Sequence, residues 1–208
     1  MQGNKRGGRP RVIDPEAVAR AVVEHGFTGL SVAAVAQRLG VNQASLYRHI
    51  GGLDDLIDTG VSLLIRTADW PAGGTGWRDH LERAAWTVWR ILTDHPGLIL
   101  AAGRRLLAND ELIIAFNRLC LELMGYGFAP AKATLAVDFV LDLACTTVLS
   151  RDFMLAGALG EDRAAPRAWA EHFDPRVREI ITTASGDGHE EWFAGKLALA
   201  LDGIEHTL

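Results

Sequence analysis

The sequence predicts an all-α protein with an N-terminal three-helix helix-turn-helix domain and a helical-bundle C-terminal domain. Apolar residues recur at helical spacing along most of the chain, and capping residues precede several of these segments. No segment shows the alternation of apolar and polar residues that predicts a half-buried strand. Of the 208 residues, 49% are hydrophobic and 23% are charged, which is the balance of a globular protein with a sizeable core.

Three short helices are predicted before residue 53. The aspartate and proline at 14–15 begin the first helix, because aspartate caps a helix and proline suits its first position. Ser31 caps the second helix, and Asn42 caps a third that runs to the glycines at 51–52. Gly40 separates the second and third helices and permits the positive φ of a tight turn.

The rest of the chain continues as helices. Predicted segments span 53–65, 77–93, 98–107, 109–124, 131–150, 175–184 and 189–206. A loop is expected at 157–175, where glycine, proline and charged residues mix. The proline- and glycine-rich segment 71–76 marks a boundary. We therefore expect two domains, one at 1–67 with a basic arm, three short helices and the start of the fourth helix, and a helical one at 68–208.

Charge is distributed unevenly along the chain. The net charge is −5, but residues 1–50 carry seven basic and three acidic side chains, a balance of +4. The remaining residues therefore carry −9, and only the N-terminal region is suited to a polyanion. The arm at 1–11 is basic and glycine-rich, and it is expected to reach along the DNA backbone or minor groove.

Composition also predicts a cytoplasmic protein with no membrane partner. The start of the chain lacks the apolar segment of a signal peptide. The most apolar stretch, 133–149, is interrupted by Asp138 and Asp142. Cys120 and Cys145 lie in apolar runs without a paired-cysteine motif, which indicates free thiols in a reducing compartment.

The segment 30–50 has the pattern of a helix-turn-helix. Glutamine pairs with adenine edges, alanine and serine touch thymine methyl groups, and tyrosine, arginine and histidine hold phosphates. The candidate DNA-binding residues are Ser31, Gln43, Ala44, Ser45, Tyr47, Arg48 and His49. The alternative is a generic helical hairpin with a polar, solvated face. The basic arm and the paired caps favour DNA binding.

Residues 14–60 resemble the DNA-binding domain of TetR-type transcriptional repressors. The resemblance lies in Gly26-Phe27, Leu30-Ser31, Leu39-Gly40-Val41 and Leu46-Tyr47-Arg48-His49. Scattered similarity beyond residue 76, such as Trp77 to Leu81 and Gly103-Arg104-Arg105, resembles the tetracycline repressor subgroup. The resemblance implies a homodimer on a palindromic operator in double-stranded DNA. It also implies a small-molecule inducer that shifts the fourth helix and spreads the two DNA-binding heads.

Three departures from the subgroup limit what the resemblance implies. Val32 and Ala33 stand where the subgroup has polar DNA contacts, and Leu53 replaces a basic phosphate contact. The base preference of the subgroup is therefore not carried over. Ala101 stands at the position of a metal-ligating histidine. A tetracycline–magnesium inducer is therefore not expected, and neither a metal nor a cofactor is predicted.

A ligand cavity is expected among the helices between 77 and 150, with apolar walls and few polar groups. The candidate ligand-binding residues are Trp86, Trp89, Leu100, Arg104, Arg105, Phe116, Phe139, Asp142 and Thr146. Each of them also suits an ordinary core or surface position. Asp138 and Asp142 lie four residues apart on an otherwise apolar helix. The pair could be an enzyme-like dyad, a ligand contact, or simply the helix face at the mouth of a cavity.

An enzyme is not predicted. The seven histidines are dispersed, and the sequence shows no metal-binding set, nucleophile elbow or phosphate loop. Segments 131–150 and 189–206 are expected to form the dimer interface as an intermolecular four-helix bundle, unless the apolar stripe of 189–206 packs only within the monomer. The predicted function is a ligand-responsive repressor released by a small hydrophobic inducer. The alternative is a DNA-binding regulator or architectural protein without a ligand.

Overall fold

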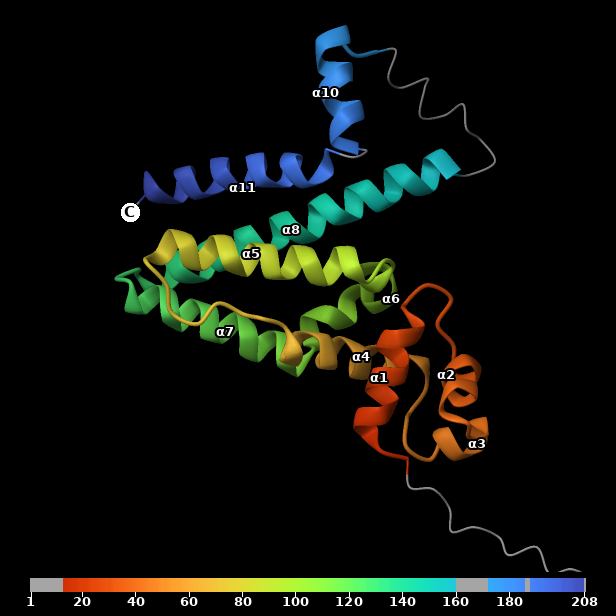
Figure 1. The fold of residues 1–208 in the computed structure, drawn as a ribbon. Coiled ribbons are helices and arrows are strands. Elements are labelled where there is room, and N and C mark those ends of the chain that lie inside the picture. Colours follow the sequence, from red (N-terminus) through yellow and green to blue (C-terminus); the bar gives the residue numbers. More distant parts are fainter. Residues whose placement is uncertain (1–12, 160–171, 186–187, 208) are drawn as a thin grey trace, which may run out of the picture.

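The computed structural model describes residues 13–159, 172–185 and 188–207, and across these ranges the chain forms helices joined by turns and contains no strand (Figure 1). The all-α prediction is confirmed. The basic arm at 1–11 lies outside the described residues, as does most of the loop expected at 157–175. Helix α8, Pro130–Leu159, continues past residue 157, so the predicted start of that loop was wrong.

Three short helices form a compact head at one end of the molecule (Figure 1). They are α1 (Pro15–His25), α2 (Val32–Leu39) and α3 (Gln43–Leu46). The three predicted caps are confirmed, since Asp14, Ser31 and Asn42 each accept a hydrogen bond from a backbone N–H of the following helix at 2.7–3.2 Å. Gly40 turns the chain after α2 with φ of 67°.

The third helix is shorter than the sequence predicts. Regular α-helix ends at Leu46, and residues 47–49 form a turn in place of the expected helix to residue 50. The carbonyl of Leu46 accepts the N–H groups of both His49 and Ile50, which tightens the chain as it leaves the helix. Leu46 is fully buried and anchors this short segment to the head.

Helix α4 (Leu53–Thr67) connects the head to the body. It packs against α1 in the head and against α6 (Leu98–Ala102), the 3-10 helix η1 (Gly103–Ala108) and α7 (Asp110–Gly125) in the body. A Cβ added at Gly60 would lie 2.5 Å from Cγ1 of Val22, so glycine permits the close approach of α4 to α1. The division into domains at residue 67 stays a prediction, because α4 belongs to both packing units.

The body is a bundle around α8. Helices α5 (Trp77–Asp94), α7 (Asp110–Gly125) and α11 (His189–Glu205) pack against it, and α10 (Pro175–Ser185) stands at the far end from the head (Figure 1). The predicted helix at 98–107 divides at Gly103 into α6 (Leu98–Ala102) and the 3-10 helix η1 (Gly103–Ala108). The segment 71–76, the expected boundary, lies in the non-helical connection between α4 and α5.

One segment of the described chain, Pro130–Asp152 of α8, is long and apolar enough to cross a membrane by length and composition. The central helix of a bundle meets the same criteria, since α8 contacts α5, α7, α10 and α11.

Candidate nucleic-acid interface and ligand cavity

The outer face of the helix-turn-helix carries polar side chains. Gln43, Arg48 and His49 are exposed, and Tyr47 is 52% exposed despite its aromatic ring. Nη2 of Arg48 donates a hydrogen bond to Oγ of Ser45 at 2.9 Å. Within the described ranges, Arg48 forms no ion pair with an acidic side chain. The face therefore offers an amide, a phenol, a guanidinium and an imidazole to a partner.

Two further candidate residues on the head have small side chains. Ala44 is exposed beside Gln43, where a methyl group can contact a base edge. Ser31 is half-buried and caps α2, since its Oγ accepts the N–H of Ala34 at 3.2 Å. This bond holds the N-terminus of α2 in place. The structure thus gathers the seven predicted DNA-binding residues in one motif, with Ser31 at the cap of α2, Gln43, Ala44 and Ser45 in α3, and Tyr47, Arg48 and His49 in the turn that follows.

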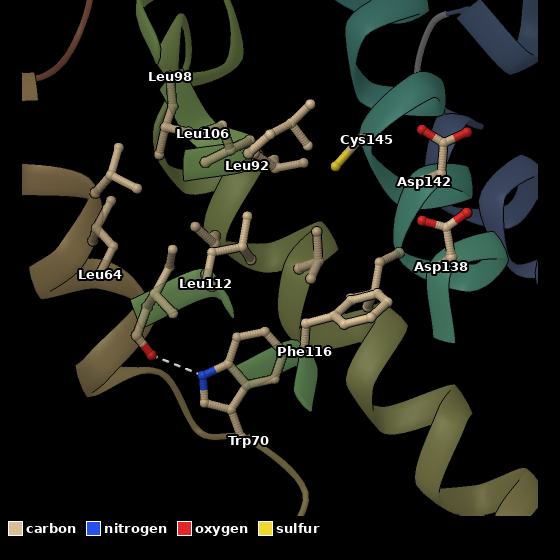
Figure 2. A pocket seen from close by; sticks show the side chains of 16 residues that line it. Leu64, Trp70, Leu92, Leu98, Leu106, Leu112, Phe116, Asp138, Asp142 and Cys145 are labelled. Atoms are coloured by element: carbon tan, nitrogen blue, oxygen red, sulfur yellow. Dashed lines mark hydrogen bonds between the residues drawn. The ribbon is translucent and has the colours of Figure 1, made fainter. Parts of the chain in front are cut away.

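The body contains a cavity of about 180 Å³ that is lined by side chains of α4, α5, α6, η1, α7 and α8 and is partly open to solvent (Figure 2). Leucine, isoleucine and valine side chains make up most of its wall, together with Trp70 and Phe116. Asp138 and Asp142 are the only charged residues among the sixteen that line it. This combination of apolar walls and two placed polar groups is typical of a small-molecule site.

Trp70 and Cys145 line the cavity, but the indole offers it no free hydrogen-bond donor and the thiol offers it no charge. Nε1 of Trp70 donates to the backbone carbonyl of Ile65 at 2.7 Å (Figure 2), so the indole presents only its apolar ring to the cavity. Burial, together with the nearby Asp142 carboxylate, raises the pKa of the Cys145 thiol to about 11. Cys145 is therefore a neutral, apolar contributor. Both cysteines are free thiols, as the sequence predicts.

The structure brings Phe116 and Asp142, of the nine predicted ligand-binding residues, to this cavity. Trp86 and Trp89 lie elsewhere, in the core between α5 and α11. The Trp89 ring stacks on Phe193 with centroids 4.3 Å apart, and Trp86 meets Phe193 edge-on at 4.9 Å. These tryptophans hold α11 against α5, because each ring buries apolar area and pairs with an aromatic neighbour.

The remaining candidates are also away from the cavity wall. Leu100 is 60% exposed on α6, and Phe139 is 51% exposed on a different face of α8. Thr146 is exposed and donates its hydroxyl to the carbonyl of Asp142 at 2.8 Å. Arg105 pairs with acidic residues of α4. The side chain of Arg104 lies outside what the structure describes.

Sequence reasoning missed most of the cavity wall. Trp70 follows α4 in a loop, and Leu64 and Leu112 read as ordinary members of amphipathic stripes. No pattern distinguishes a leucine that faces a cavity from one that faces a neighbouring side chain. The spacing of Asp138 and Asp142 was the one available signal, since two carboxylates on an apolar helix require a polar surrounding.

A second apolar feature is a groove between α8 and α11. Leu135, Phe139 and Leu199 line it and are 67%, 51% and 76% exposed. Exposed leucines and phenylalanines that gather in one groove mark an interaction surface, whereas single ones do not. No group of three or more histidine, cysteine or acidic side chains suited to a metal ion occurs in the described part of the chain.

Comparison with known proteins agrees with this geometry. Residues 16–58 match the family described as bacterial regulatory proteins, tetR family. The chain is 30% identical over 208 residues to the class D tetracycline repressor protein of Escherichia coli, which covers 98% of this chain and 91% of that protein. The chain belongs to the tetR family. It is therefore a transcriptional regulator and not an enzyme. The prediction of a ligand-responsive repressor agrees with membership of this family.

Solved structures share the fold over nearly the whole chain. A TetR variant from Acinetobacter baumannii AYE in complex with minocycline superposes with a TM-score of 0.69 at 21% identity, covering 94% of this chain and 98% of that one. ActR of Streptomyces coelicolor in complex with actinorhodin gives 0.68 at 18% identity, covering 93% and 96%. At these identities the likeness concerns the fold, and the two bound molecules are those of the relatives.

Proposed function

We propose that this tetR-family protein binds a palindromic operator in double-stranded DNA as a homodimer and leaves it when a small hydrophobic inducer occupies the cavity between α4 and α8. The observation that carries this proposal is the position of α4. Val61, Leu64 and Ile65 of α4 line the cavity, and the same helix packs on α1 of the head. A ligand that displaces α4 therefore displaces the head.

The proposed DNA contacts divide by chemistry. The amide of Gln43 is suited to read an adenine edge in the major groove, and Ala44 and Ser45 are suited to contact bases through small groups. Tyr47, Arg48 and His49 are exposed beside them and suited to hold phosphates. Ser31 orders the N-terminus of α2, which supports a phosphate contact there.

Further contacts support a rigid link between head and body. Oγ1 of Thr28 in the head donates to the carbonyl of Pro96 at 3.3 Å, and the Phe27 ring meets His95 edge-on at 6.3 Å. Arg66 of α4 pairs with Glu16 of α1 at 2.8 Å and lies 3.9 Å from Glu111 of α7. Ligand and operator then disfavour each other by a coupling energy of roughly 1–3 kcal/mol.

The groove between α8 and α11 is proposed as the homodimer surface. It lies on the segments 131–150 and 189–206, and its exposed leucines and phenylalanine gain stability when a second copy covers them. Phe193 and Leu197 of α11 are buried within the monomer, whereas Leu199 is exposed, and this exposure supports the proposal that part of α11 faces a second copy.

The inducer is proposed to be small and hydrophobic, without a metal ion. Ala101 is not in the cavity wall and offers no ligand atom from its side chain. The cavity presents no histidine, so a metal-bridged ligand has no imidazole to hold it. The protein is proposed to act in the cytoplasm, where operator DNA lies. Its DNA-binding unit is proposed to end near residue 67, within α4.

A two-stage binding experiment tests this function. Duplexes bound by the wild-type protein are selected from random DNA, and a palindrome bound by two protomers is expected. Hydrophobic natural products and antibiotics are then screened by thermal shift, and each hit is titrated against the bound duplex. Hits that weaken operator binding support the proposal. Tight operator binding that no stabilising compound reduces contradicts it and favours a regulator without a ligand.

A further inference from the structure

We propose that the inducer is a lipophilic cation whose positive charge is neutralised by Asp138 and Asp142. This inference rests on the function proposed above and adds the chemical class of the ligand. The cavity itself is the site, and its wall combines three features that each favour this class. They are a pair of carboxylates, two aromatic rings and a surface that is otherwise apolar.

The carboxylates stand one helical turn apart on α8, so both lie along the same side of the cavity (Figure 2). No basic side chain forms an ion pair with Asp138 or Asp142 in the ranges that the structure describes. Both carboxylates are exposed to solvent at the edge of the cavity. A ligand that covers them removes this water and has to replace it with a favourable partner.

This requirement discriminates between ligands by charge. A neutral hydrophobic molecule would desolvate the carboxylates without making a favourable interaction with them. An anion would also repel them. A cation compensates for the lost water through direct attraction to the two carboxylates, and this attraction strengthens as the bound ligand displaces their solvent. The Cys145 thiol is neutral, because burial raises its pKa to about 11, so among the lining residues the two aspartates alone supply the negative charge.

The aromatic rings provide an independent second observation. Trp70 and Phe116 both line the cavity, and in the view of Figure 2 the Phe116 ring lies between Trp70 and Asp138. The indole N–H of Trp70 is already donated to Ile65, so what faces the ligand is the electron-rich ring. Cations are attracted to such ring faces, and tryptophan gives the strongest attraction. The leucine-rich remainder of the wall requires that the rest of the ligand be apolar.

A matched pair of probes isolates the charge. We would use (naphthalen-1-ylmethyl)trimethylammonium and its neutral carbon isostere, 1-neopentylnaphthalene, which differ only in replacing the quaternary nitrogen by carbon. Equilibrium dialysis against the full-length protein gives both affinities. The cation is expected to bind at least roughly tenfold more tightly than the isostere, a difference within the range of a desolvated cation beside carboxylates and rings.

The variants then assign the charge effect to the two residues. Asp138→Asn together with Asp142→Asn removes both charges at constant size and should abolish the preference for the cation, while the isostere binds as before or better. Glu82→Gln, an exposed carboxylate on α5 that is not in the cavity wall, serves as the control and should keep the preference. Equal binding of both probes to the wild type, a preference that survives in the double variant, or binding of neither probe overturns the inference.

Operator release is measured separately on the same samples. Probes that bind equally and release the selected duplex would leave the proposed function standing and overturn only the ligand class. A cation that binds through the aspartates and does not release the duplex would support the ligand class and contradict the proposed function. The two claims therefore fail in different measurements.

Discussion

The guanidinium of Arg105 in η1 donates a hydrogen bond to the carboxylate of Asp58 in α4. This bond, assisted by the neighbouring acidic groups of α4, raises the pKa of Arg105 above its usual value. Asn109, at the end of the same 3-10 segment, donates to Oγ of Ser62 at 2.9 Å. Because Leu106 of η1 lines the cavity, these bonds join the cavity wall to the helix that carries the head.

Removing this link should reduce the response to ligand more than the binding of DNA. In Arg105→Gln we expect operator affinity without ligand to change by less than about threefold, because the pair is solvent-exposed. The ligand-induced loss of operator affinity should fall severalfold. Arg176→Gln breaks a pair with Asp174 at the start of α10, far from the cavity and more exposed than the Arg105 pair, and serves as the control. An unchanged response in Arg105→Gln would show that the link carries no coupling.

Packing of α4 on α1 predicts a strong effect at Gly60. The Cβ of Gly60→Ala would lie 2.5 Å from Cγ1 of Val22 and 3.4 Å from Cζ of Phe27, and both neighbours are buried. Overpacking of this kind typically costs about 1–3 kcal/mol of unfolding free energy. Urea unfolding measures it. Gly125→Ala, where no atom lies within 4 Å of the new Cβ, should leave stability unchanged or raise it slightly.

Some parts of the structure follow from local sequence signals, and others depend on packing between distant segments. The caps at Asp14, Ser31 and Asn42 were predictable because capping depends on side chains a few residues apart. The early end of α3 was not, because Leu46 is fixed by burial in the head and not by a local signal. The cavity was the least predictable part, because it forms where helices that are distant in the sequence pack together. Trp86, for example, was predicted to contact the ligand but packs against Phe193 in the core. A large aromatic residue suits a core and a cavity wall equally, so its sequence position does not distinguish the two.

Self-association should depend on the α8–α11 groove. Phe139→Lys places a charge among the exposed apolar side chains of that groove and should weaken dimerisation by roughly 2 kcal/mol or more, as for a central interface residue. Sedimentation velocity over a concentration series measures the shift. Leu121→Lys changes a residue on α7 that is 56% exposed and outside the groove, and it should sediment as the wild type does. A fully dimeric Phe139→Lys protein would contradict the proposed surface.

Acid should destabilise the fold through His80. This side chain is fully buried, and its Nε2 lies 2.8 Å from Oε2 of Glu122, although the two are not aligned for a hydrogen bond. Burial lowers the pKa of His80 below its usual 6.5, and the attraction of Glu122 offsets this only in part. Below the usual pKa the unfolded chain therefore binds a proton that the folded protein does not, and stability falls as pH decreases.

The pH effect is measurable by urea unfolding between about pH 7.5 and about pH 5.5. The wild-type free energy of unfolding should decrease toward the acidic end, and His80→Gln should show a smaller decrease. Burial also lowers the pKa of His95, so His95→Gln should remove a separate part of the slope. A slope that is the same in His80→Gln and the wild type would show that His80 does not titrate differently in the folded and unfolded states.

Operator affinity of Gln43→Ala tests most directly that this face of the head reads DNA. Gln43 is exposed at the start of α3, and loss of a paired glutamine–adenine contact should weaken binding to the selected palindrome by about 1–3 kcal/mol. Fluorescence anisotropy at fixed salt gives the dissociation constant. Gln37→Ala, at an exposed glutamine of α2, is the matched control and should bind as the wild type does. Equal operator affinity of Gln43→Ala and the wild type would contradict the account.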